Sequence, residues 1–157
     1  MKLIARYARR EFYARKLVTP TALGDAPFVG LQFACLLWNH SVERDVDAAS
    51  TLLSSLIDSG CRYIVCAGLD CEWWHDVADE LFVAKYLDAP DEERERNHVM
   101  TTWHAQESPD DVAFFFAFNT SFDDVSFDRF LVLHLGDGPD IDAVDSAVHA
   151  QARALAG

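Results

Sequence analysis

The chain has 157 residues, of which 50% are hydrophobic, with only seven glycines and five prolines and a formal net charge of −13 at pH 7. This composition predicts one globular domain with a sizeable core, and it excludes disordered, collagen-like and multidomain chains. The acidic balance repels polyanions, so it argues against nucleic-acid binding and favours cationic partners.

The first segment differs from the rest of the chain in charge. Residues 1–17 hold six of the 13 basic residues and one acidic residue, which leaves seven bases against 25 acids, a net charge of −18, for the remaining 140 residues. Ile4, Ala8 and Phe12 lie at helical spacing, so we expect residues 1–19 to form a basic helix. This helix either folds onto the acidic body of its own chain or is held out for an acidic partner or membrane surface.

Residues 28–157 have the pattern of a single α/β domain. The nearly continuous apolar run 28–38 indicates a buried strand, residues 45–59 show the spacing of an amphipathic helix that Gly60 ends, and residues 61–67 form a second strand. Asp70 can cap a helix that runs to about residue 86. Residues 88–97 are charged and predict a solvated loop, and a third strand follows over residues 98–103.

A Ser108 cap, Pro109 in the first turn and two acids predict a helix over residues 109–119. This helix is apolar nearly all round, so its second face is covered either by a loop or by a partner protein. A fourth strand over residues 130–135 and a last helix complete the pattern. The alternation predicts a three-layer, Rossmann-like sandwich around a mainly parallel sheet of four strands or slightly more.

Ligands of open parallel sheets bind beyond the carboxyl ends of the strands, where loops and helix starts converge. The residues that follow the four predicted strands are polar, titratable or nucleophilic. We therefore expect a ligand-binding edge, with helix caps and solvated turns as the alternative explanation. The predicted ligand-binding residues are Asn39, His40, Asp70, Cys71, Trp103, His104, Glu107 and His134.

Three of these residues are candidates for catalysis: His104, Cys71 and Glu107. Cys71 lies in the first turn of its helix, where the dipole favours a thiolate, and His104 or His40 can serve as its base. An inert, buried cysteine is the alternative, since the flanking Asp70 and an adjacent glutamate raise a thiol pKa.

The four cysteines fit reduced thiols in a cytoplasmic protein, because a domain of this size needs no disulfides. No zinc spacing and no nucleotide-binding loop is present in the sequence. A metal site assembled from His40, Asp70, His104 and His134 is an open alternative, but we expect no metal and no cofactor. No apolar run is long enough for a membrane span, so we expect no membrane partner.

Two strings, GLDCEWW from residue 68 and MTTWHAQE from residue 100, resemble a family of small bacterial proteins classed as a domain of unknown function. The resemblance covers residues 28–135 and carries no assigned reaction. It implies that Asp70, Cys71, Trp103, His104 and Glu107 belong to the family's pattern. The basic N-terminal segment departs from that family.

Two functions follow as hypotheses. The acidic body and the apolar helix favour a non-catalytic cytoplasmic binding module, an accessory or immunity-like partner in a bacterial system, which engages a cationic protein surface. The alternative is a small enzyme or ligand sensor at the strand edge, with His104 as general base and Cys71 or a bound water as nucleophile.

Overall fold

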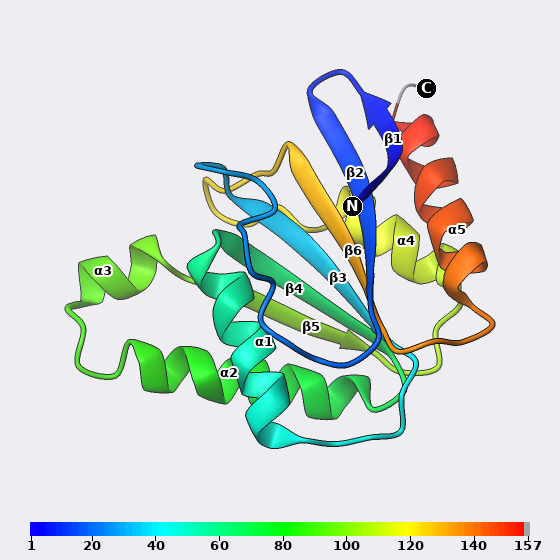
Figure 1. The fold of residues 1–157 in the computed structure, drawn as a ribbon. Helices are drawn as coiled ribbons and strands as arrows, with labels where there is room; N and C mark the ends of the chain where they lie inside the picture. The colour runs from blue at the N-terminus through cyan, green and yellow to red at the C-terminus, as the bar shows by residue number, and fades with distance from the viewer. Residues whose placement is uncertain (156–157) are drawn as a thin grey trace.

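The computed structural model describes residues 1–155, which form one six-stranded sheet flanked by helices (Figure 1). In chain order the elements are β1 (Lys2–Tyr7), β2 (Arg10–Leu17), β3 (Phe33–Asn39), α1 (Val46–Asp58), β4 (Cys61–Gly68), α2 (Cys71–Lys85), α3 (Asp91–Arg96), β5 (Met100–His104), α4 (Pro109–Phe118), β6 (Arg129–Leu135) and α5 (Ile141–Ala154).

The strands lie in the order β1-β2-β6-β3-β4-β5. The five strands from β2 to β5 in this order are parallel, and β1 pairs antiparallel with β2 at one edge. The mainly parallel sheet is therefore confirmed. It has six strands because the N-terminal segment supplies two of them.

The expected N-terminal basic helix is wrong, since residues 2–17 form the β1–β2 hairpin. Phe12 and Ala14 alternate with Tyr13, so they face the core on one side of the sheet, and Phe12 stacks on Phe130 at 4.4 Å between ring centroids. The hairpin turn was not apparent because Ala8, rather than glycine or asparagine, takes the left-handed φ of 52°. Ile4 and Phe12 thus share an apolar surface through strand pairing instead of helical spacing.

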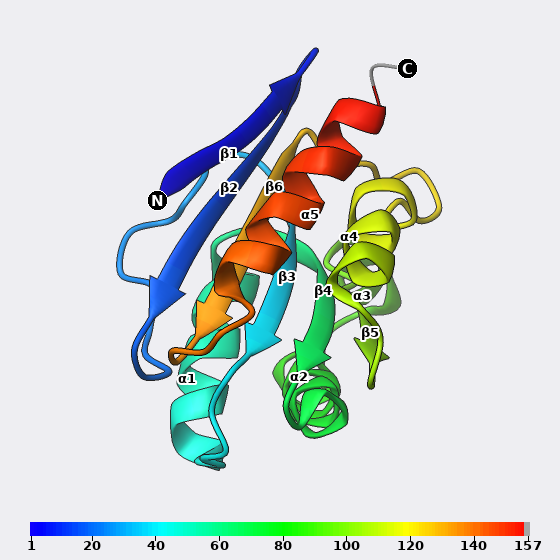
Figure 2. The ribbon, with the colours of Figure 1, turned by 90° about the vertical axis from the view of Figure 1, so that its right-hand side faces the viewer.

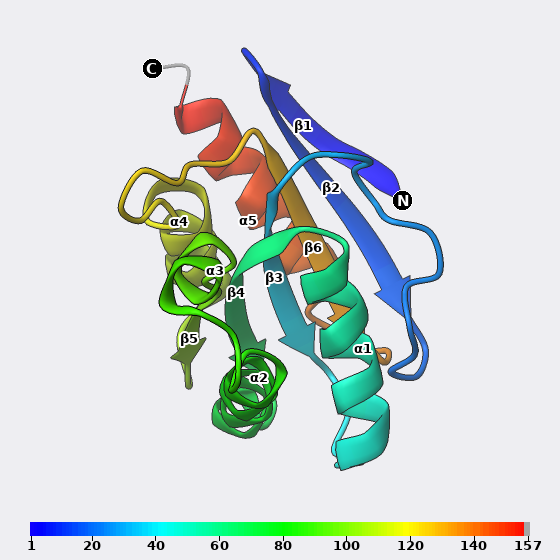
Figure 3. The same ribbon diagram turned by 90° about the vertical axis from the view of Figure 1, so that its left-hand side faces the viewer.

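Because side chains alternate between the two faces along each parallel strand, the sheet has one hydrophobic core on each face. In β3, Cys35 and Leu37 pack under α1 and α2, whereas Leu36 and Trp38 pack under α4 and α5. Figure 2 views the face that α4 and α5 cover, and Figure 3 views the face that α1 and α2 cover. This is a three-layer α/β arrangement.

The predicted helix starts are confirmed at two places where a side chain caps the helix. The Asp45 carboxylate accepts a hydrogen bond from the Ala48 amide at 3.1 Å, and the Ser108 hydroxyl accepts one from the Asp111 amide at 3.1 Å. Asp70 precedes α2 without a side-chain cap, and the strand expected over residues 98–103 is β5, which starts at Met100 and ends at His104. Two further segments also differ from the prediction. β3 begins only at Phe33, after a turn at Gly30, and the charged loop at 88–97 contains the short helix α3.

Among residues 1–155, no helix has both the length and the apolar character that a membrane crossing requires.

Phe12 tests whether the N-terminal hairpin is part of the folded core. Its side chain is fully buried, so Phe12→Ala should lower the free energy of unfolding by about 3–5 kcal/mol in urea denaturation. Tyr7→Ala on β1 is the control, because Tyr7 is 39% exposed and its loss should cost less than about 1 kcal/mol. Equal losses for the two variants would contradict this hairpin arrangement.

Candidate functional site

A pocket of about 430 Å³ lies beyond the carboxyl ends of the parallel strands, to which the arrowheads in Figure 1 point. Its walls come from the ends of β3 and β4 and from the loops that lead into α4 and α5. The lining residues are Trp38, Asn39, His40, Gly68, Leu69, Gln106, Glu107, Asp137, Gly138, Pro139 and Asp140.

The pocket lies near a point where neighbouring strands continue into helices on opposite faces of the sheet. β3 and β6 are neighbours, yet β3 continues into α1 on one face while β6 continues into α5 on the other. The loops after these two strands meet at their start, where the His40 amide donates to the Leu135 carbonyl at 2.8 Å. The pocket lies beside this contact, over the ends of β3 and β4 and between the loops that lead into α4 and α5. Open parallel sheets bind their ligands at such reversal points.

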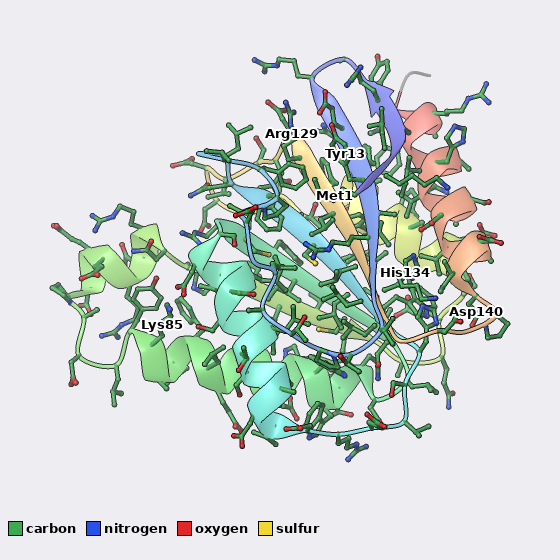
Figure 4. All side chains as sticks on the ribbon, viewed as in Figure 1. Met1, Tyr13, Lys85, Arg129, His134 and Asp140 are labelled. Carbon is green, nitrogen blue, oxygen red and sulfur yellow. The ribbon has the colours of Figure 1, made fainter. Side chains whose placement is uncertain are left out.

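His40 follows β3, and His134 lies near the end of β6, where Figure 4 labels it close to the start of α5. His40 Nε2 is 2.9 Å from His134 Nδ1, and His134 Nε2 is 2.8 Å from Asp145 Oδ1 on α5. The His134 residue is 1% exposed. Three side chains from three elements thus form one hydrogen-bonded chain that ends at the pocket.

The order of donors along this chain follows from the carboxylate. An ionised Asp145 only accepts, so His134 Nε2 carries the proton between them. In a neutral His134 the other nitrogen, Nδ1, then accepts the Nε2–H of His40. Neutral His40 is left with an unprotonated Nδ1, which lies beside the pocket residue Gly138: a Cβ at Gly138 would lie 2.9 Å from that nitrogen.

Burial, followed by repulsion from the neighbouring His134, lowers the pKa of His40 below its usual value. The nearby carboxylates of Asp140 and Asp137 act in the opposite direction but are weaker. The neutral form of His40, which is the form that accepts a proton, is consequently favoured.

Asn39 and Gly68 bring the loops after β3 and β4 together. The Asn39 side-chain amide donates to the carbonyls of Ser41 and Leu69 at 2.9 and 2.7 Å. Gly68 has a φ of 81°, and a Cβ there would overlap the Asn39 carbonyl oxygen and the Trp38 ring. Only glycine fits this position, because it combines a left-handed backbone with close backbone contact.

A second histidine lies behind the opposite wall. His104 Nδ1 is 2.9 Å from Glu107 Oε2, and its Nε2 is 3.0 Å from the Thr102 hydroxyl. His104 is 8% exposed, so both ring nitrogens are engaged below the surface, while Glu107 lines the pocket.

The structure places the eight predicted binding residues in three groups. Asn39, His40 and Glu107 line the pocket, whereas His134 and His104 lie directly behind His40 and Glu107. The remaining three do not line it: Asp70 pairs with Arg44, Trp103 packs against His75 at 4.5 Å between ring centroids, and Cys71 is buried.

Cys71 does not have the environment of a nucleophile. Its residue is 4% exposed, and burial raises the pKa of its thiol above the usual value. Its neighbour from β5 is the main chain of His104, whereas the His104 ring is engaged by Glu107 and Thr102.

The sequence prediction missed the pocket residue Asp140 and, at the end of the hydrogen-bonded chain, Asp145. Asp145 follows the buried Val144 in a helix, and no short motif connects it with a histidine on another strand. Within residues 1–155, no three histidine, cysteine, aspartate or glutamate side chains are close enough to hold one metal ion. The four residues of the alternative metal site, His40, Asp70, His104 and His134, are accordingly not gathered around one point in the described part of the chain.

A mainly parallel sheet in a three-layer α/β arrangement, with a pocket beyond the carboxyl ends of its strands, defines the class of this protein. The chain belongs to a family described as a domain of unknown function, DUF7684, whose family model matches residues 12–151. The resemblance in the sequence is thus confirmed, and the match extends it to most of β2 and α5. No curated protein matches the chain.

The shifted titration of His40 has a consequence for stability. Because folding lowers the pKa of His40, the unfolded chain takes up this proton at higher pH than the folded chain does. The corresponding stability is present above the pKa of an unfolded histidine and is lost as the pH falls through the folded pKa. We expect the free energy of unfolding to fall between pH 7 and pH 5 by less in His40→Gln than in the wild type.

NMR titration of the His40 ring gives the direct measurement, with His40→Gln for resonance assignment. The midpoint should lie below that of the histidines in the urea-unfolded chain. A midpoint at or above that value would show that His40 is not held neutral.

Proposed function

We propose that the protein binds a small molecule in the pocket beyond the ends of β3 and β4, and that His40 accepts a proton from it as a general base. The observation that carries this proposal is the hydrogen-bonded chain from Asp145 through His134 to His40, which ends at the pocket. It favours the small enzyme or ligand sensor among the two hypotheses, with His40 in the role first expected of His104.

The arrangement supports proton transfer because it fixes both the tautomer and the orientation of His40. When Nδ1 takes a proton, the imidazolium charge is stabilised by its hydrogen bond to His134, which in turn donates to Asp145. His104 is less suited, since its two nitrogens are already bonded to Thr102 and Glu107. A bound water or a group of the ligand is the source of the proton, and the Cys71 thiol is not required.

The four free, buried cysteines support a cytoplasmic place of action.

Turnover can be sought without knowing the substrate. The wild-type protein is incubated with the small-molecule fraction of a cell extract, and mass spectrometry follows which compounds bind or disappear. Since general base catalysis contributes about 100-fold or more, His40→Gln should lower the rate of conversion by at least that factor. Asp145→Asn should also lower it, because an amide can offer its N–H to His134 and reverse the tautomers.

His149→Gln is the matched control, as His149 is an exposed histidine on α5 outside the hydrogen-bonded chain. It should leave conversion unchanged. The proposal fails if no compound binds or is consumed, or if His40→Gln converts the substrate at the wild-type rate.

A second candidate function, the non-catalytic binding module, is favoured by one surface feature. Phe114 and Phe118 on α4 are 50% and 38% exposed, and their rings stack at 5.0 Å between centroids. Asp110 and Asp111 lie in the first turn of the same helix. An aromatic pair beside carboxylates suits a cationic protein surface with apolar side chains, as an accessory or immunity-like role requires.

This interface can be tested separately from the pocket. Replacing Phe114 and Phe118 with serine should change the free energy of unfolding by less than about 1 kcal/mol, because both side chains are exposed. The same double variant should lose capture of a cationic partner in pull-down experiments. Capture should also weaken at high salt. Val83→Ser on α2, at a site 60% exposed, is the control, and undiminished capture by the double variant would exclude this surface.

A further inference from the structure

We propose that the small molecule of this pocket is an organic amine, a ligand with a protonated nitrogen and an apolar body, and that Glu107 and Asp140 bind its ammonium group. The inference rests on the proposed function, in that the pocket must take a small molecule. It adds the chemical class of that molecule.

The charge of the pocket wall is of one sign. Its charged side chains are Glu107, Asp137 and Asp140, and no lysine or arginine lines it among the described residues. Lys16 pairs with Asp137 at 3.0 Å, which leaves Glu107 and Asp140 without a basic partner from the pocket wall. The neutral form of His40, which the hydrogen-bonded chain to Asp145 accommodates, adds no positive charge. An anionic ligand would be repelled, whereas a cation would be attracted.

Glu107 is held in place for such a contact. The Thr102 hydroxyl can donate to His104 Nε2, so His104 Nδ1 carries a proton and donates it to Glu107 Oε2 at 2.9 Å. This buried histidine fixes one carboxylate oxygen from behind. A carboxylate accepts several hydrogen bonds, and the remaining acceptor positions of Glu107 are available to an ammonium N–H, which forms a charge-assisted bond.

The rest of the wall fits an apolar body. Trp38, Leu69 and Pro139 supply apolar surface between the polar groups. The volume of about 430 Å³ lies in the usual range of small-molecule sites, roughly 300–1,000 Å³. An aromatic or aliphatic group of modest size can therefore occupy the pocket while its nitrogen reaches the carboxylates.

Two helices, α4 and α5, begin at the pocket rim, and helix starts by themselves favour anions. In α4 this preference is already met, because the Ser108 hydroxyl accepts from the Asp111 amide and Asp110 and Asp111 lie in the first turn. α5 likewise carries an acid, Asp142, in its first turn. The carboxylates therefore compensate both helix dipoles, and a further negative charge would be added beside them.

The test compares three small molecules of similar shape and different charge: phenethylamine, 2-phenylethanol and 3-phenylpropionate. Each is titrated into the ¹⁵N-labelled full chain at pH 7, and the backbone amide signals of Asn39, Gly68 and Gly138 are followed. We expect the amine to shift these signals with the highest affinity. Glu107→Gln combined with Asp140→Asn removes both carboxylates and should weaken its binding by at least about tenfold, since one charge-assisted contact alone accounts for roughly that factor.

Asp123→Asn with Asp124→Asn is the matched control, since it removes two carboxylates from a loop that does not line the pocket. It should leave the affinity for phenethylamine unchanged. Stronger shifts of the same signals by 3-phenylpropionate would overturn the amine assignment while leaving the pocket as a ligand site. An equal loss of affinity in both double variants, or no saturable shift with any of the three compounds, would also overturn it.

Failure of the proposed function can be distinguished from failure of the amine assignment. It would appear as retained conversion in His40→Gln, which is independent of the charge preference of the pocket.

Discussion

The parallel pairing of β3 with β6 is the constraint on which the rest of the molecule depends. Its register, from Ala34 opposite Phe130 to Asn39 opposite Leu135, brings the carboxyl ends of both strands to the same level. The chain then leaves β3 toward α1 and leaves β6 toward α5, so helices cover both faces of the sheet. The pocket, the contact between His40 and His134, and the reach of Asp145 all follow from this single pairing.

Burial of His134 would be unfavourable without partners on both ring nitrogens, because an unpaired buried polar group loses its hydration. The structure supplies one partner from the loop after β3 and one from α5. The same logic applies to His104, whose partners are Thr102 and Glu107. His134 thus connects the sheet to His40, and His104 connects it to Glu107, and both of these partners line the pocket.

Much of this arrangement could be predicted from the sequence, but only where the signal is local. Caps such as Asp45 and Ser108 mark helix starts, and polar residues after apolar runs mark the strand ends beside which the pocket lies. The β1–β2 hairpin could not be predicted, since its turn at Ala8 has no glycine or asparagine and its basic residues suit a helix equally well. Asp145 on α5 could not be assigned, because its partner His134 lies on a strand, and local sequence patterns do not reveal which strand and helix come into contact.

The contacts that hold the loops after β3 and β4 together have a thermodynamic consequence. The Asn39 side chain holds the Ser41 and Leu69 carbonyls, and Gly68 lies too close to the Asn39 main chain for either loop to shift alone. This wall of the pocket is therefore preorganised before any ligand arrives. A ligand that enters it does not have to order these backbone segments, so less of its contact energy is lost to conformational entropy. Rigid walls of this kind favour discrimination by shape over adaptation to many ligands.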